Sequence, residues 1–182
     1  MRRDPGAAVL ERGLTMYWQY IKYVVRHKWY VFIECCRVGI PLRGLLHDMS
    51  KLLPGEFIPY ARYFYGKQDL TEQEGIAEQR HFDLAWLHHQ KRNKHHWQWW
   101  VLPEDDGGVK VLPMPEVFRK EMLCDWKGAG KAQGYKEPGE CAKWYRANKG
   151  NMQLHPDTRS WIESELSLCI IPDGRLAFEE ND

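Results

Sequence analysis

The stretch Leu-Leu-His-Asp-Met-Ser-Lys at residues 45–51 brings an imidazole, a carboxylate and an amine into one short segment. Pro41, which suits the first turn of a helix, predicts that residues 41–51 are helical. On a helix, adjacent His47 and Asp48 point about 100° apart, so both can reach one cation that lies beside the helix. The stretch therefore predicts the nucleus of a metal site, and such a site needs further ligands from elsewhere in the chain.

Other imidazoles and carboxylates that could complete such a site lie on separate predicted helices. The candidates are His27, His88, His89, His95, His96 and Asp125. Four of these histidines fall within nine residues, and tryptophans flank them, which is unusual for an exposed surface. This pattern favours metal or phosphate binding, and the alternative is a solvated basic helix face.

His27 and Asp125 could each have a role other than metal binding. His27 could be a buried histidine that is bonded to a backbone carbonyl. Asp125 lies next to Trp126 in the apolar half of its predicted helix. An isolated carboxylate there would be costly, so we expect Asp125 to be paired, to cap a helix or to bind metal.

The composition excludes several classes of protein. The 182 residues are 43% hydrophobic, which favours a single domain with its own core. Lys and Arg number 26 against 25 Asp and Glu, so no strong charge field favours nucleic acid or an anionic membrane. Five cysteines without a Cys-x-x-Cys pair favour a reducing, cytoplasmic environment over disulfides or a zinc ribbon. Charged residues interrupt the apolar stretch at residues 16–33 before it reaches membrane-spanning length, which predicts a soluble protein.

Apolar residues recur at helical spacing along most of the chain, which predicts an all-α fold. Helices are expected at residues 16–38, 41–51, 56–65, 115–126, 140–148 and 157–168, and another begins at Thr71. The helix that begins at Thr71 either continues through residue 97 or turns at Asn93. A small β-hairpin is expected near residues 101–112. In the first helix, the residues that show the helical spacing are Trp18, Ile21, Val24, Val25, Trp29, Phe32 and Ile33.

The domain organisation follows from these segments. Residues 1–15 are predicted to be a peripheral extension, residues 16–170 a single helical domain, and residues 171–182 a flexible acidic tail.

With these residues in this order, the chain resembles the HD-domain superfamily of metal-dependent phosphohydrolases. His27, the His47-Asp48 doublet and Asp125 carry this resemblance. The segments 47–51, 57–64, 88–97 and 122–130 are more closely similar to a group of short phage and bacterial proteins that we associate with that superfamily. The resemblance covers about residues 16–165, and it implies an HD-like helical bundle with inward-facing ligands.

The resemblance also implies a metal centre. His27, His47, Asp48 and Asp125 would hold one divalent transition metal, and Asp48 would bridge to a second ion. Members of the cluster His88, His89, His95 and His96 would hold this second ion. Imidazole and carboxylate ligands suit Mn, Fe, Co, Ni or Zn. Each ligating imidazole should donate its other N–H to an acid, for which Glu34 and Asp83 are candidates.

The activity that follows is the hydrolysis of a nucleotide or another small phosphoester by a water whose pKa the metal lowers. Lys51 and Arg92 would contact phosphate, and Glu56 would orient the water or carry a proton. Surface ion pairing is the alternative for Lys51 and Glu56.

Two other functions remain open. An HD-type diiron oxygenase would use the same ligands with open positions for oxygen. A non-enzymatic binder of single-stranded nucleic acid or nucleotides would use the nine tryptophans as a stacking surface, although the near-zero net charge counts against it. The expected partner is a small phosphorylated substrate, and no membrane partner is expected.

Overall fold

The computed structural model describes residues 5–66 and 70–167. Within these ranges lie seven α-helices, three short 3-10 helices and one two-stranded antiparallel sheet. The predicted all-α class with one small hairpin is therefore confirmed. The chain divides into two compact units, which are described separately below. Unit 1 comprises Met1–Arg26 and Asp48–Arg92, and unit 2 comprises His27–His47 and Asn93–Asp182. The predicted acidic tail at residues 171–182 lies outside the described residues.

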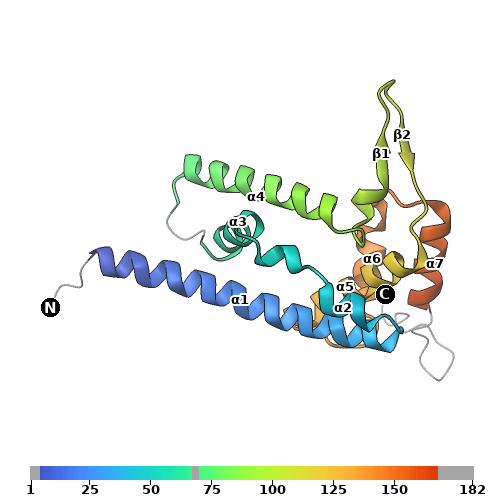
Figure 1. Ribbon diagram of the computed structural model, residues 1–182, viewed down its shortest axis with the longest axis horizontal. Coiled ribbons are helices and arrows are strands. Elements are labelled where there is room, and N and C mark those ends of the chain that lie inside the picture. Colours follow the sequence, from blue (N-terminus) through green and yellow to red (C-terminus); the bar gives the residue numbers. More distant parts are fainter. Residues whose placement is uncertain (1–4, 67–69, 168–182) are drawn as a thin grey trace, which may run out of the picture. The chain divides into compact units, whose positions relative to one another are not determined.

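Unit 1 is built around the packing of α3 on α4. Its elements are the first part of α1 (Pro5–Arg37), η1 (Met49–Leu52), α3 (Pro54–Tyr65) and α4 (Glu72–Arg92). In Figure 1, α3 lies between α4 and the first part of α1. The hydroxyl of Thr71 lies 2.7 Å from the Glu74 carboxylate, which also accepts the Thr71 backbone N–H at 2.8 Å, so the start of α4 has the reciprocal contacts of a capping box.

Many apolar residues of α1 are exposed. Four of the residues that show the helical spacing are exposed, namely Trp18, Ile21, Val25 and Trp29. The side chains that α1 buries in unit 1 are Tyr20 and Val24, which pack with Tyr60 and Ala61 of α3 and Ala85 of α4. Apolar residues occur around most of the circumference of α1, and the period alone does not identify the side that faces the core. The helix also begins at Pro5, so it includes most of the predicted N-terminal extension.

Two adjacent valines give a direct test of this orientation, because Val24 is 2% exposed and Val25 is 63% exposed. We expect Val24→Ala to lower the free energy of unfolding by about 2 kcal/mol, since it leaves a cavity in the core of unit 1. Val25→Ala should change that free energy by less than about 0.5 kcal/mol. Chemical denaturation of both variants measures the difference, and equal losses would contradict the observed orientation.

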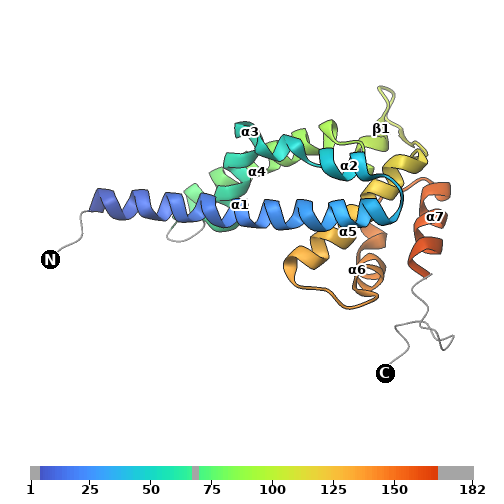
Figure 2. The same cartoon turned by 60° about the horizontal axis from the view of Figure 1, so that its bottom comes forward.

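Unit 2 contains the remaining elements. They are the second part of α1, α2 (Pro41–Leu46), η2 (Trp97–Trp100), β1 (Val101–Pro103), β2 (Val109–Val111), α5 (Glu116–Gln133), α6 (Glu140–Asn148), η3 (Lys149–Asn151) and α7 (Pro156–Ser167). Helices α5, α6 and α7 contact one another, as Figure 2 shows. Their core includes Met122, Tyr145 and Ile162. In the hairpin, Val101 pairs with Val111, and the strands extend away from these helices (Figure 1).

Helices α1 and α5 approach each other closely in unit 2, at Gly128. A Cβ atom added to Gly128 would lie 2.5 Å from Cγ2 of Val31 and 2.8 Å from its backbone nitrogen. Only a glycine therefore allows the two backbones to pack at this distance. The contact lies about one helical turn from His27 on α1 and from Asp125 on α5, so it fixes the spacing of two predicted ligands.

The prediction of one helix over residues 41–51 was wrong, because α2 ends at Leu46. His47 has φ −52° and ψ 130°, and Asp48 adopts the left-handed conformation with φ 52° and ψ 30°. Among the described residues, no other non-glycine residue has a positive φ. Aspartate tolerates this conformation better than most residues, and such conformations are frequent at functional sites. The orientation of the His47 and Asp48 side chains is thus set by this break and not by a helical repeat.

None of the described helices is both long enough and apolar enough to span a membrane.

Candidate metal centre

Three imidazoles converge on one carboxylate in unit 2. His27 comes from α1, His47 follows α2, His95 precedes η2, and Asp125 lies on α5. The Nε2 atoms of His27 and His47 lie 3.2 and 3.3 Å from Oδ1 of Asp125, and Nε2 of His95 lies 3.9 Å from Oδ2. No more than 2% of the surface of each histidine is exposed. We call these four residues the three-histidine cluster.

The distances in the three-histidine cluster suit a metal ion. Nitrogen and oxygen ligands about 2.0–2.2 Å from one tetrahedral ion are separated from each other by roughly 3.3–3.6 Å. The observed separations of 3.2, 3.3 and 3.9 Å lie close to that range. Imidazole nitrogens with one carboxylate oxygen form a donor set that suits divalent transition metals. His27, His47 and Asp125 therefore offer two Nε2 atoms and one Oδ1 atom at a spacing that suits one ion, and His95 lies beside the other oxygen of the same carboxylate.

Glu121 contacts the Nδ1 atoms of the His47 and His95 rings. Its Oε1 lies 3.2 Å from Nδ1 of His47 and 3.4 Å from Nδ1 of His95. Arg43 donates from Nε to Oε2 of Glu121 at 2.8 Å. Glu121 and Asp125 are four residues apart on α5, so they lie on the same face of the helix. An imidazole whose Nδ1 is held in this way presents Nε2 as the metal-binding nitrogen.

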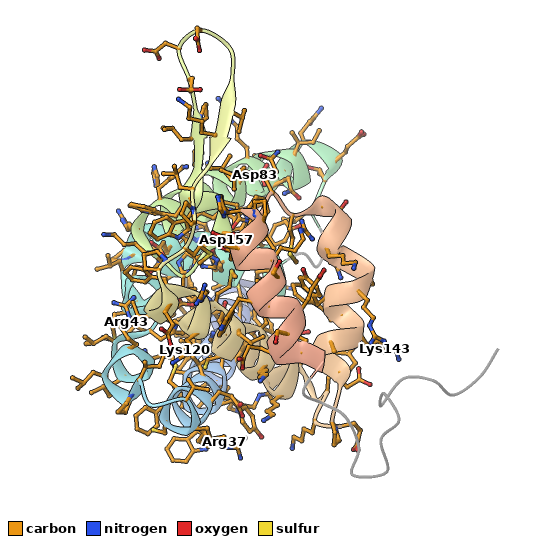
Figure 3. All side chains as sticks on the ribbon, turned by 90° about the vertical axis from the view of Figure 1, so that its right-hand side faces the viewer. Arg37, Arg43, Asp83, Lys120, Lys143 and Asp157 are labelled. Atoms are coloured by element: carbon orange, nitrogen blue, oxygen red, sulfur yellow. The ribbon has the colours of Figure 1, made fainter. Side chains whose placement is uncertain are left out.

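Glu34 and Asp83, the acids expected in this supporting role, make other contacts. Glu34 pairs with Arg37 at 2.6 Å and with Lys131 at 2.5 Å, while Asp83 accepts a hydrogen bond from Gln79. Figure 3 labels Arg37, Arg43 and Asp83. Sequence reasoning missed Glu121, although its four-residue spacing from Asp125 was a signal that could have identified it.

Both carboxylates of this region are anionic at neutral pH. Burial raises the pKa of Asp125, but hydrogen bonding with His27 and His47 lowers it by more, so the pKa lies well below its ordinary value. Burial likewise raises the pKa of Glu121, and hydrogen bonding with His47 and His95 brings it down to about 2. The cluster thus offers negative charge to a cation, and Arg43 balances the charge of Glu121.

Unit 1 contains the other predicted site residues in a second arrangement. Nε2 of His89 lies 3.3 Å from Oδ1 of Asp48, and its Nδ1 lies 2.8 Å from Oε2 of Glu56. Lys51 pairs with Asp48 at 2.6 Å, and Arg92 pairs with Glu56 at 2.8 Å. These five residues form a continuous series of alternating bases and acids, which we call the Glu56–His89 chain.

Burial distinguishes the members of the Glu56–His89 chain. Asp48, Glu56 and His89 are at most 1% exposed, so Glu56 does not make an ordinary surface ion pair. Burial raises the pKa of Glu56, but hydrogen bonding with His89 and Ser50 leaves it below the usual value. Burial lowers the pKa of His89, while Asp48 and Glu56 raise it by more. About half of the Arg92 side chain is exposed.

The four clustered histidines occupy different environments. Helix α4 ends at Arg92, so the turn near Asn93 is observed and the unbroken helix is not. His88 is exposed on α4, and no group of three or more potential ligands among the described residues includes it. The ring of His96 is partly buried, with its centroid 4.2 Å from that of His95.

A comparison with protein families matches residues 16–168 to a family of unknown function, DUF5662. The chain belongs to this family. The DUF5662 match includes every residue of the three-histidine cluster and of the Glu56–His89 chain. No curated protein and no solved structure matches the chain.

Proposed function

We propose that this protein is a metal-dependent phosphohydrolase that acts on a nucleotide or a related small phosphoester. The observation that carries the proposal is the convergence of three buried Nε2 atoms on the Asp125 carboxylate. The resemblance to the HD-domain superfamily, which rests on His27, His47, Asp48 and Asp125, supplies the reaction class. Asp48 belongs to unit 1, and its role as a ligand stays a prediction from that resemblance.

The three-histidine cluster would hold one divalent transition metal. When bound, the metal would lower the pKa of a coordinated water and offset negative charge on a phosphoryl oxygen. Glu121 keeps the rings of His47 and His95 in the orientation that turns Nε2 toward Asp125. Arg43 fixes Glu121 in turn, so the ligands are positioned before a metal arrives.

Residues of the Glu56–His89 chain would act on the substrate. Arg92 offers five N–H donors in a planar fork, so it can contact phosphate oxygens while it remains paired with Glu56. Lys51 would neutralise phosphate charge from its position beside Asp48. Glu56, which contacts both His89 and Ser50, would pass a proton through His89.

Metal analysis followed by activity measurements tests the proposal. The protein, purified without chelators, should contain a transition metal, and the metal-free protein should release phosphate from a nucleotide panel only after Mn, Fe, Co, Ni or Zn is added. Oxygen consumption is measured in parallel with ferrous iron. Oxygen consumption without phosphate release would favour the oxygenase, and nucleotide binding with neither reaction would favour the non-enzymatic binder.

His95 and His88 form a matched pair that tests the cluster, because one ring is buried and the other is exposed. We expect His95→Ala to weaken metal binding by about 100-fold or more, since it removes a ligand as well as a contact of Glu121. His88→Ala should bind metal like the wild type. Competition with a chromophoric chelator measures both affinities, and a stronger effect at His88 would refute the assignment.

A further inference from the structure

Two tyrosine hydroxyls are buried in unit 1 without a hydrogen-bond partner among the described residues. They belong to Tyr20 of α1 and Tyr60 of α3, which are 1% and 5% exposed. Most buried polar groups have a partner, so each exception requires an explanation. Tyr145 in unit 2 shows the usual situation, because its hydroxyl contacts Glu163 at 3.3 Å and Arg159 at 3.4 Å.

The two phenols lie in the same polar region of unit 1. Their ring centroids are 6.3 Å apart, and the ring of Tyr60 lies edge-on to that of His89 with centroids 6.1 Å apart. Burial raises the pKa of both phenols, and the same three charges act on both, with Lys51 lowering the pKa and Asp48 and Glu56 raising it. Both phenols therefore lie within the electrostatic influence of the Glu56–His89 chain.

The charges of this region indicate what kind of ligand the two hydroxyls would bind. Asp48 is already paired with Lys51, and Glu56 is already paired with Arg92. A neutral phenol donates a hydrogen bond through its O–H, so the two hydroxyls suit an acceptor. An oxyanion would accept hydrogen bonds from both phenols and from the ammonium group, which has three N–H donors. Hydrogen bonds to an anion are stronger than those to a neutral acceptor, so such a ligand would satisfy both hydroxyls.

We propose that the hydroxyls of Tyr20 and Tyr60, together with the ammonium group of Lys51, bind an oxyanion, which is the phosphoryl group of the substrate or the phosphate released from it. The identification of this oxyanion with a substrate group rests on the proposed phosphohydrolase function. The binding site itself rests on the two buried hydroxyls. Neither tyrosine was a candidate site residue in the sequence.

Tyrosine-to-phenylalanine variants test the proposal in metal-free protein, with inorganic phosphate as the probe. Thermal unfolding of the wild type should shift upward with phosphate, and the shift gives a dissociation constant. In Tyr20→Phe and Tyr60→Phe, that constant should increase by about tenfold or more, because a hydrogen bond to an anion is lost. Without phosphate, both variants should unfold at or above the wild-type temperature, because each loses a hydroxyl that has no partner.

Tyr145→Phe is the matched control. It removes a hydroxyl that has partners, so it should lower the unfolding temperature and leave the phosphate shift unchanged. The proposal is overturned if wild-type protein gains no stability from phosphate, or if the Tyr20→Phe, Tyr60→Phe double variant retains the full shift. It is also overturned if the single variants lose stability without phosphate as Tyr145→Phe does, since the hydroxyls would then have structural partners.

The measurement separates this proposal from the proposed function. Phosphate binding is observed without metal and without turnover, so a protein that binds phosphate at the two tyrosines but hydrolyses nothing contradicts only the phosphohydrolase. Metal-dependent hydrolysis that survives in the double variant with an unchanged KM contradicts only the tyrosine site.

Discussion

Replacement of Asp125 with alanine is expected to remove bound metal and, with it, hydrolysis. The Asp125 carboxylate is the group that the Nε2 atoms of His27, His47 and His95 all face, so its loss removes the acid on which the three-histidine cluster converges. Loss of a residue that only supports a ligand typically weakens metal binding by about 10–100-fold, and the loss of a ligand itself should exceed that range. Elemental analysis and a metal titration of the purified variant measure the effect.

Asp105→Ala is the control for this substitution, because Asp105 is exposed in the hairpin of unit 2. It should retain wild-type metal content and activity. Circular dichroism should show that Asp125→Ala keeps its helices, so that loss of metal is not a consequence of unfolding. A folded Asp125→Ala variant with unchanged metal content would mean that the ion, if any, is held elsewhere.

Gly128→Ala should have the largest effect on stability. The added methyl group would lie 2.5 Å from Cγ2 of Val31 and would also meet the Val31 backbone, which cannot move as a flexible side chain would. Such overpacking costs about 3 kcal/mol of unfolding free energy. Because Val31 follows His27 by one turn on α1, displacement of α1 from α5 should also weaken metal binding. Denaturation and metal titration of the same preparation measure both effects.

Gly130→Ala is the matched substitution two residues along α5. A Cβ atom there would lie 3.8 Å from its nearest neighbour, which is ordinary contact. Since alanine favours a helix over glycine by about 1 kcal/mol, this variant should be as stable as the wild type or slightly more stable. If Gly128→Ala were equally well tolerated, the close approach of α1 and α5 would not exist in solution.

Sequence reasoning identified most of the elements because their signals are local. The helix start at Thr71 and the hairpin near residues 101–112 each depend on a few neighbouring residues. The orientation of α1 could not be predicted in the same way, because apolar residues occupy both its exposed and its buried faces. Only the packing of Val24 against its neighbours in unit 1 distinguishes the two.

Sequence reasoning named His27, His47 and Asp125 as candidate ligands of one ion, and the structure brings these three side chains together in unit 2. It assigned His95 to a second ion, whereas His95 lies beside Asp125 as well. Glu121 was missed because its role depends on its contacts with the rings of His47 and His95. Its four-residue spacing from Asp125 was the only sequence signal for that role. The break after α2 was missed because its cause, the left-handed Asp48, is not a glycine.

The X-ray absorption spectrum of the metal-loaded protein tests the central claim most directly. Scattering from imidazole rings is distinctive, and it reports how many histidines bind the ion. The three-histidine cluster predicts three imidazoles in the wild type, two in His95→Ala and three in His88→Ala. A spectrum with oxygen ligands alone, or an imidazole count that His95→Ala leaves unchanged, would contradict the metal centre proposed for unit 2.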